Sequence, residues 1–170
     1  MKTFKKILLV CLAVFCLVGC DYSTKRIAKY ELKDKPVQSY LGGNLQLHYA
    51  ENPGGMLGVG DNLSESMRFI VFRIFIAVML SFLFIYIITG KARNKLLFTA
   101  LILILSGGTG NLIDRIMNHG KVTDFIIMGI SSTHTGIFNI ADFYVTTGVV
   151  LIIISTLFTK KKPLISDLHL

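Results

Sequence analysis

Residues 96–113 read LLFTALILILSGGTGNLI, an uncharged run of 18 mostly apolar residues with small residues near its end. Three further uncharged runs of 14, 17 and 17 residues occupy 7–20, 74–90 and 143–159. A helix that crosses a bilayer needs roughly 20 predominantly apolar residues, and each run reaches that length once flanking Lys and Arg side chains extend to the interface. The glycines between Ser106 and Gly110 allow neighbouring helices to approach closely. The four runs therefore predict a compact bundle of transmembrane helices.

Composition and charge agree with this class of protein. The 170 residues are 52% hydrophobic and 16% charged, which is too apolar for an ordinary soluble domain. The net charge of +8 comes from basic residues that cluster before the first run, between the second and third, and after the fourth. By the positive-inside rule these ends are cytoplasmic, and the other two connections face outward. Because no basic patch interleaved with aromatic residues lies elsewhere, we expect no nucleic-acid partner.

We expect an all-α membrane protein with one integral membrane domain, residues 1–170. Its predicted spans are residues 4–22, 70–90, 95–114 and 138–159, with outer loops 23–67 and 115–137 and a cytoplasmic tail 160–170. In the first loop, apolar Leu45, Leu47 and Tyr49 alternate with less apolar residues, as in a half-buried strand. Residues 56–59 could form a second strand, giving a small extracytoplasmic sheet. Asn62 and Glu65 have the spacing of a capping box and predict an interfacial helix that leads into the second span.

The three cysteines all lie in the first run, so they cannot crosslink an outer domain. Leu17-Val18-Gly19-Cys20 after a short apolar run also resembles the end of a bacterial lipoprotein signal peptide. That interpretation would make Cys20 a lipidation site and remove the residues before it. We regard this match as accidental, because a lipoprotein is normally a soluble domain and three further spans follow.

Polar residues gather at the predicted outer ends of the third and fourth spans. Asn111, Asp114 and Arg115 share one helix face, and Asn139 and Asp142 share another. A helix from Asp142 to residue 159 rises roughly 26 Å, which places this acid just inside a hydrocarbon core about 30 Å thick. Ionisable residues at that depth are functional candidates. A purely structural interpretation would pair Asp142 with Arg115 or Lys121.

Five ordered blocks, together spanning nearly the whole chain, resemble the lipoprotein signal peptidase (signal peptidase II) family of bacterial intramembrane aspartyl proteases. The blocks are Asp21 with Thr24-Lys25, Asn52-x-Gly54, Asn111-Leu-Ile-Asp114-Arg115, Val122-x-Asp124-Phe125 and Phe138-Asn139-x-Ala141-Asp142. The chain departs from the family in lacking a Trp before Phe138, where Thr135-Gly136-Ile137 stands instead, and in the residues after Gly54. These departures concern substrate preference and leave the acids intact.

The resemblance implies an endopeptidase that cleaves diacylglyceryl-modified prolipoproteins on the N-terminal side of the lipidated Cys. It implies Asp124 and Asp142 as the catalytic dyad and a polar substrate-binding or supporting shell of Asn52, Gly54, Asn111, Asp114, Arg115, Asn139, Asp21 and Lys25. Two carboxylates that share a proton can act as base on a water and as acid toward the scissile carbonyl. We expect no metal and no cofactor, since the four histidines show no metal-ligand spacing. Membrane lipid is an expected partner, and we expect a monomer with its site near the outer leaflet.

The alternative is a non-catalytic membrane protein. It would be either a lipoprotein modified at Cys20 or a transport bundle in which Asp114, Arg115, Asp124 and Asp142 form a polar relay. Four helices without an inverted repeat leave little room for a transport pathway.

Overall fold

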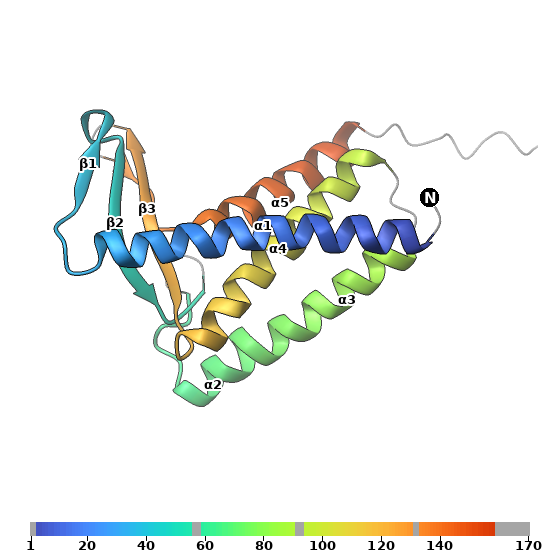
Figure 1. Cartoon of the computed structure of the whole chain (residues 1–170), viewed down its shortest axis with the longest axis horizontal. Coiled ribbons are helices and arrows are strands. Elements are labelled where there is room, and N and C mark those ends of the chain that lie inside the picture. The colour runs from blue at the N-terminus through green and yellow to red at the C-terminus, as the bar shows by residue number, and fades with distance from the viewer. Residues whose placement is uncertain (1–2, 56–58, 91–93, 131–132, 159–170) are drawn as a thin grey trace, which may run out of the picture.

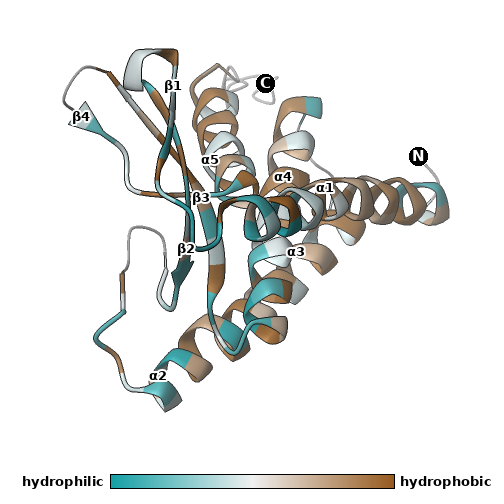
Figure 2. Cartoon of the chain, turned by 60° about the vertical axis from the view of Figure 1, so that its left-hand side comes forward, coloured by the Kyte–Doolittle hydropathy of each residue, from teal (hydrophilic) through white to brown (hydrophobic). Residues whose placement is uncertain are grey.

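The computed structural model describes residues 3–55, 59–90, 94–130 and 133–158. Four helices in these ranges are long and apolar enough to cross a membrane, which confirms the predicted class. They are α1 (Thr3–Leu32), α2 (Glu65–Phe69) running through a π-helix into α3 (Ile76–Thr89), α4 (Lys95–Met117) and α5 (Ile140–Phe158). Figure 1 shows the helices with a small sheet at one end of the bundle, which we call the sheet end. The helices are largely hydrophobic along their length (Figure 2).

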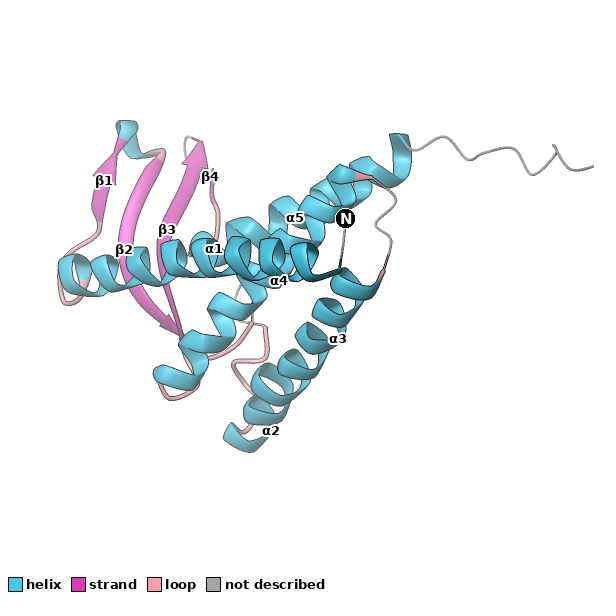
Figure 3. Ribbon diagram, turned by 45° about the vertical axis from the view of Figure 1, so that its right-hand side comes forward, coloured by secondary structure: helices cyan, strands magenta, loops and turns pink. Residues whose placement is uncertain are grey.

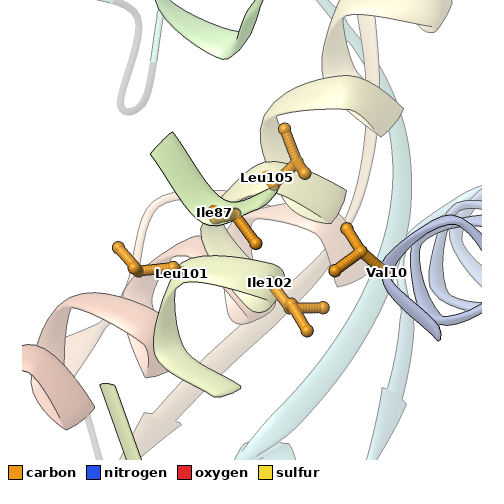
Figure 4. Close-up of a cluster of buried hydrophobic side chains, with 5 residues drawn as sticks. All are labelled: Val10, Ile87, Leu101, Ile102 and Leu105. Atoms are coloured by element: carbon orange, nitrogen blue, oxygen red, sulfur yellow. The ribbon is translucent and has the colours of Figure 1, made fainter. Parts of the chain in front are cut away.

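The apolar core lies toward the opposite end of the bundle, near the N-terminus. It is formed by Val10 of α1, Ile87 of α3 and a group of α4 residues, Leu101, Ile102 and Leu105 (Figure 4). At the same end, Lys6 Nζ donates a 2.6 Å hydrogen bond to the carbonyl oxygen of Gly90 and ties α1 to α3. At the sheet end, Ala28 and Leu32 of α1 pack with Phe125 in a second apolar cluster, so distant parts of the chain are joined at both ends of the bundle.

Small residues on α4 and α5 allow these two helices to pack backbone against backbone. A Cβ atom added at Gly107 would collide with the carbonyl oxygen of Ala141, and one at Gly148 would lie 2.7 Å from the carbonyl oxygen of Ala100. This confirms the close packing that the sequence around Ser106–Gly110 predicted. These contacts also fix the position along α4 at which α5 begins, and the polar residues gather there.

The sheet has four antiparallel strands in the order β1-β2-β3-β4 (Figure 3). They are β1 (Gln38–Tyr40), β2 (Leu45–Asn52), β3 (Val122–Ile130) and β4 (Thr133–His134), with a short 3₁₀ turn, Leu41–Gly43, between the first two. The predicted strand around Leu45–Ala50 is confirmed as β2. The second strand expected at residues 56–59 falls mostly on 56–58, which lie outside the described residues.

The sheet does not come only from the connection between the first two spans, as predicted, because β3 and β4 lie within residues 115–137. The first four residues of β3, Val122 to Phe125, are all buried. A strand buried on both faces lacks the apolar and polar alternation that marks a half-buried strand. Strand β3 therefore left no periodic signal in the sequence.

The helix that leads into the second span begins at Glu65, two residues later than a cap at Asn62 predicts. The Ser64 hydroxyl accepts a 3.3 Å hydrogen bond from the backbone N–H of Met67, so Ser64, and not Asn62, is the N-cap. A π-helical stretch, Ile70–Phe75, joins α2 to α3 without a break. The expected interfacial helix is therefore the first part of one continuous helix.

Helix α1 continues beyond the predicted end of its span at residue 22, as far as Leu32. Cys20 lies in the interior of this helix and is exposed on its surface. Cleavage before Cys20 would remove Val10 from the core and Lys6 from its bond to α3. This arrangement argues against the alternative in which the first helix is a removable signal peptide.

Candidate active site

The start of α5 is built by a reciprocal pair of capping bonds. The Asn139 side-chain oxygen accepts a 3.0 Å hydrogen bond from the backbone N–H of Asp142, and the Asp142 carboxylate accepts one of 3.2 Å from the backbone N–H of Asn139. This is the geometry of a capping box, which explains why the two residues stand three apart. The Asp142 carboxylate keeps a second oxygen that accepts a 2.8 Å bond from Asn111 Nδ2 of α4.

Asp124 is placed by the pairing of β3 with β2. The register sets Asp124 opposite Ala50 and Asn52 opposite Val122, so the side chain of Asn52 reaches the acid from 72 residues away in sequence. Asn52 Nδ2 donates a 2.9 Å hydrogen bond to one carboxylate oxygen, and Asn139 Nδ2 donates one of 2.6 Å to the other. Asn139 thus contacts both acids and holds them in one cluster.

The electrostatics of Asp124 favour its protonated form. The pKa of Asp124 is raised to about 6, chiefly by burial and also by the negative charge of Asp142, while the hydrogen bonds from Asn52 and Asn139 oppose the rise. Two neighbouring carboxyl groups can share one proton, because the negative charge of one disfavours ionisation of the other. A raised pKa beside a second acid is a feature of sites that transfer protons.

A second, separate cluster of acids surrounds Lys25 of α1. Its ammonium lies 2.9 Å from the carboxylate of Asp21 and 3.4 Å from that of Asp114, and all three side chains are buried. Lys25 also donates a 2.8 Å hydrogen bond to Asn111 Oδ1. This bond fixes the orientation of the Asn111 amide, so that its NH₂ group points at Asp142.

Asp21 and Asp114 each join two parts of the chain. The Asp21 carboxylate accepts a 2.9 Å hydrogen bond from the backbone N–H of Ala141 at the start of α5. The Asp114 carboxylate accepts bonds of 2.7 Å from the backbone N–H of Thr123 on β3 and 2.6 Å from Asn118 Nδ2. The Lys25 cluster therefore positions the elements that carry Asp124 and Asp142.

Arg115 of α4 lines the cavity next to the two acids and binds the loop at Gly54. Arg115 Nη2 donates a 2.6 Å hydrogen bond to the carbonyl oxygen of Gly54, and Lys121 pairs with Glu51 at 2.9 Å. The purely structural interpretation that pairs Asp142 with Arg115 or Lys121 is therefore wrong for the described residues. Gly54 has no room for a side chain, because a Cβ atom there would collide with the carboxylate of Asp61.

Some residues that shape this region were not predicted from the sequence. The guanidinium carbon of Arg115 lies 5.3 Å from the centre of the Phe72 ring, on the π-helix. The same ring lies against Gly55 and Gly60 of the loop. A single Phe in an apolar helix carries no signal for such a role. Asn118 could have been found, since it follows Asp114 by four residues on the same helix face.

Two cavities meet at Asp142. A small polar one of about 40 Å³ is lined by residues that include Asn52, Arg115, Asp124 and Asp142, and it has room for a water molecule. A larger apolar one of about 380 Å³ shares Asp142 and Ile137 with it. Thr135, Gly136 and Ile137, which stand where the resembling family has its Trp, line this apolar pocket.

Comparisons with known proteins agree with one another. A family model described as Signal peptidase (SPase) II matches residues 13–158. The chain is 36% identical over 156 residues to a lipoprotein signal peptidase of Borrelia hermsii (strain HS1 / DAH), covering 88% of this chain and 89% of that one. A lipoprotein signal peptidase of Caldicellulosiruptor bescii is 35% identical over 150 residues, covering 84% and 91%.

The fold matches as well. A bacterial membrane enzyme structure solved by the in meso method at 2.3 Å resolution has a TM-score of 0.76 and 32% sequence identity, over 93% of this chain and 94% of that one. A second such structure, at 1.9 Å resolution, has a TM-score of 0.72 and 29% identity. With a family model that spans most of its length and relatives aligned over nearly all of it, the chain belongs to the signal peptidase II family.

Proposed function

We propose that this protein is an aspartic endopeptidase that removes the signal peptide from diacylglyceryl-modified prolipoproteins, with Asp124 and Asp142 as its catalytic dyad. Proteins named lipoprotein signal peptidase are its relatives over most of the chain, which supports the reaction. The contacts of the two acids support the aspartic mechanism and the residue roles.

The observation that carries the proposal is a contrast between two pairs of buried or half-buried acids. Asp21 and Asp114 share the ammonium of Lys25, as acids with a structural role do. Asp124 and Asp142 form no ion pair within the described ranges, and their carboxylates are hydrogen-bonded by the amides of Asn52, Asn111 and Asn139. Arg115 lines the same cavity and attracts both charges, but from beyond ion-pair distance. A cation in direct contact would hold both acids ionised, whereas neutral amides orient them and still allow one proton to be shared.

The proposed reaction uses one protonated and one ionised carboxyl group. The ionised carboxylate takes a proton from a water molecule, whose oxygen attacks the scissile carbonyl carbon, while the protonated acid donates its proton to the carbonyl oxygen. The tetrahedral intermediate then collapses and its C–N bond breaks. The carboxyl group that took a proton from water donates it to the departing amine nitrogen, and the other carboxylate regains its proton from a hydroxyl group of the intermediate. Burial of Asp124 favours the proton on this residue, and the small cavity between the acids has room for the water.

The surroundings of the dyad suggest how the substrate is held. The apolar pocket beside Asp142 would take an apolar part of the prolipoprotein next to the scissile bond. Asn52, Asn111, Arg115 and Asn139 would bind its backbone, with Gly54 allowing the chain to pass close to Arg115. Asp21, Lys25 and Asp114 would support the site through the elements they join.

The chain is a multi-pass protein of the bacterial inner membrane, and we place both termini in the cytoplasm. This orientation puts the sheet end, and with it the dyad, near the outer leaflet, where the lipidated Cys of a substrate lies. Lys clusters at residues 2–6 and 160–162 support it through the positive-inside rule. We infer that the monomer is the active form, since one chain supplies every residue of the proposed site.

The test is cleavage of a diacylglyceryl-modified prolipoprotein by the purified protein, with an unlipidated substrate as comparison. Asp124→Asn and Asp142→Asn should each lower kcat by at least about 10³-fold, because either change removes a group needed for proton transfer. Asp34→Asn, a change of an exposed acid at the sheet end, should leave the rate unaltered. Folded Asp124→Asn or Asp142→Asn protein that retains wild-type activity would refute the dyad.

A further inference from the structure

An apolar groove of about 910 Å³ runs along the bundle between α1, α3 and α4. Helices α1 and α3 meet near the N-terminus and diverge toward the sheet end, which opens the groove in that direction (Figure 1). Its lining shares Val14, Leu80, Phe84 and Leu105 with the apolar cluster that contains Val10 and Ile87. Residues that line it include Phe15, Val18 and Gly19 of α1, Ala77 and Ser81 of α3, and Thr109 of α4.

The groove is separate from the candidate active site. On α4 it is lined by Leu105, Thr109 and Leu112, whereas Asn111 and Arg115 face the two acids. At about 3.6 residues per turn, Thr109 and Leu112 point to a different side of the helix from Asn111. None of the residues given for the groove also lines the cavity between Asp124 and Asp142. Helix α4 therefore lies between the two.

Basic side chains stand at the open mouth of the groove. Tyr22 lines both the groove and a small depression that also contains Arg26 and Lys29, which continue the same side of α1 by one and two turns. Unlike the buried Lys25, neither has a carboxylate within salt-bridge distance in the part of the chain that the structure describes. Arg73 of the π-helix, which contacts Gly120 beyond the end of α4, adds a third positive charge near this end.

This combination fits the two halves of a phospholipid. The groove lies in the hydrocarbon region and offers almost no polar partner for water, so acyl chains are what can fill it. Arginine and lysine at the level of the head groups bind phosphate oxygens. In the orientation proposed above, these charges lie on the outer side of the membrane, where the positive-inside rule gives no reason for them.

We propose that the groove binds a phospholipid of the leaflet at the sheet end, with its acyl chains between α1 and α3 and its phosphodiester on Arg26 and Lys29. The lipid fills the space between the diverging helices α1 and α3 and keeps the two helices apart. It is a bound component and not the substrate, because α4 separates it from the dyad. The inference does not depend on the proposed peptidase mechanism.

The experiment is native mass spectrometry of the full chain released from detergent, titrated with phosphatidylglycerol or with a diacylglycerol that carries the same acyl chains. Wild-type protein should retain phosphatidylglycerol with an apparent Kd at least about tenfold lower than that for diacylglycerol. Arg26→Gln/Lys29→Gln should raise the phosphatidylglycerol Kd about tenfold. Lys33→Gln/Lys35→Gln, which removes two exposed charges from the same end of α1, should leave it unchanged.

A second pair of variants tests the groove itself. Gly19→Phe places a ring in open space within the groove, since nothing lies within 4 Å of a Cβ atom there, and it should abolish retention of both lipids. Leu9→Phe, at an exposed position on the side of α1 away from the groove, should not. Equal binding of both lipids, or retention by Gly19→Phe, would overturn the proposal. Displacement of the lipid by a diacylglyceryl-modified prolipoprotein would also overturn it, because the groove would then be a substrate site.

Discussion

Replacing Lys25 by methionine should destabilise the protein far more than an ordinary loss of one charge. Lys25 and Asp21 form an i,i+4 pair at 2.9 Å whose side chains are only 4% and 2% exposed, and Asp114 lies on the same ammonium at 3.4 Å. Methionine fills a similar volume but leaves two buried carboxylates without a cation. Hydrogen bonds from Ala141 and Thr123 remain, yet they do not neutralise the charge.

The expected size follows from the burial. Removing one partner of a buried ion pair costs about 3–5 kcal/mol, because the remaining charge stays desolvated. For a chain of this length, each kcal/mol lowers Tm by about 2–4 °C, so the loss should be about 6–20 °C. The double variant Asp21→Asn/Lys25→Met should recover part of it, because an amide still accepts the bond from Ala141 and carries no charge.

The same helix offers a matched control. Lys35 and Glu31 form another i,i+4 pair on or just beyond α1, at 3.4 Å, but their side chains are 49% and 55% exposed. Lys35→Met should therefore cost less than about 1 kcal/mol. Tm in detergent, followed by circular dichroism for all variants, measures the difference. If Lys25→Met and Lys35→Met lower Tm equally, or if the double variant is no more stable than Lys25→Met, the reasoning about burial fails.

Two further predictions concern the acids and the helix contacts. The value of kcat/KM should fall about tenfold per pH unit above about pH 6 as Asp124, whose pKa is raised to about 6, loses its proton. Asn52→Ala removes a bond that stabilises the ionised form, so it should move this limb to higher pH; a pH–rate profile that shifts the other way contradicts it. Gly110→Ala should cost about 1–3 kcal/mol in unfolding free energy, since its Cβ atom would lie 2.6 Å from Asp21 Oδ2. Gly19→Ala, where the same atom meets nothing, is the comparison, and an equal loss there would refute the packing argument.

The helices and part of the sheet were predictable because their signals are local. Uncharged apolar runs predicted all four long helices, and alternation predicted β2. Strand β3 was not predicted, since its first four residues are uniformly buried and their environment depends on helices elsewhere in the chain. The sequence likewise could not predict that Ser64, and not Asn62, is the N-cap, because both residue types cap helices equally well.

The site was predictable as a set of residues, though not as a geometry. Motif spacing selected ten residues, and hydrogen bonds and ion pairs link all of them into one network that runs from Asp21 through Asn111 and Asn139 to Asn52 and Arg115. Their catalytic and binding roles stay predictions. The contribution of Phe72 and the exclusion of a side chain at Gly54 arise from contacts between distant segments, which a single sequence does not display.

The hydrogen bond from the backbone N–H of Ala141 to Asp21 joins the first helix to the last, and it has a consequence for biogenesis. A nascent chain that has inserted only α1, α3 and α4 already carries Asp21, Lys25, Asn111 and Asp114, but it lacks Asn139 and Asp142. Its acid cluster around Lys25 can form, while the pair Asp124–Asp142 cannot. If Asp124 and Asp142 act as the proposed dyad, insertion of α5 is the step that completes the hydrolytic site, and a ribosome-bound or truncated intermediate should be proteolytically silent in the membrane it shares with other emerging polypeptides.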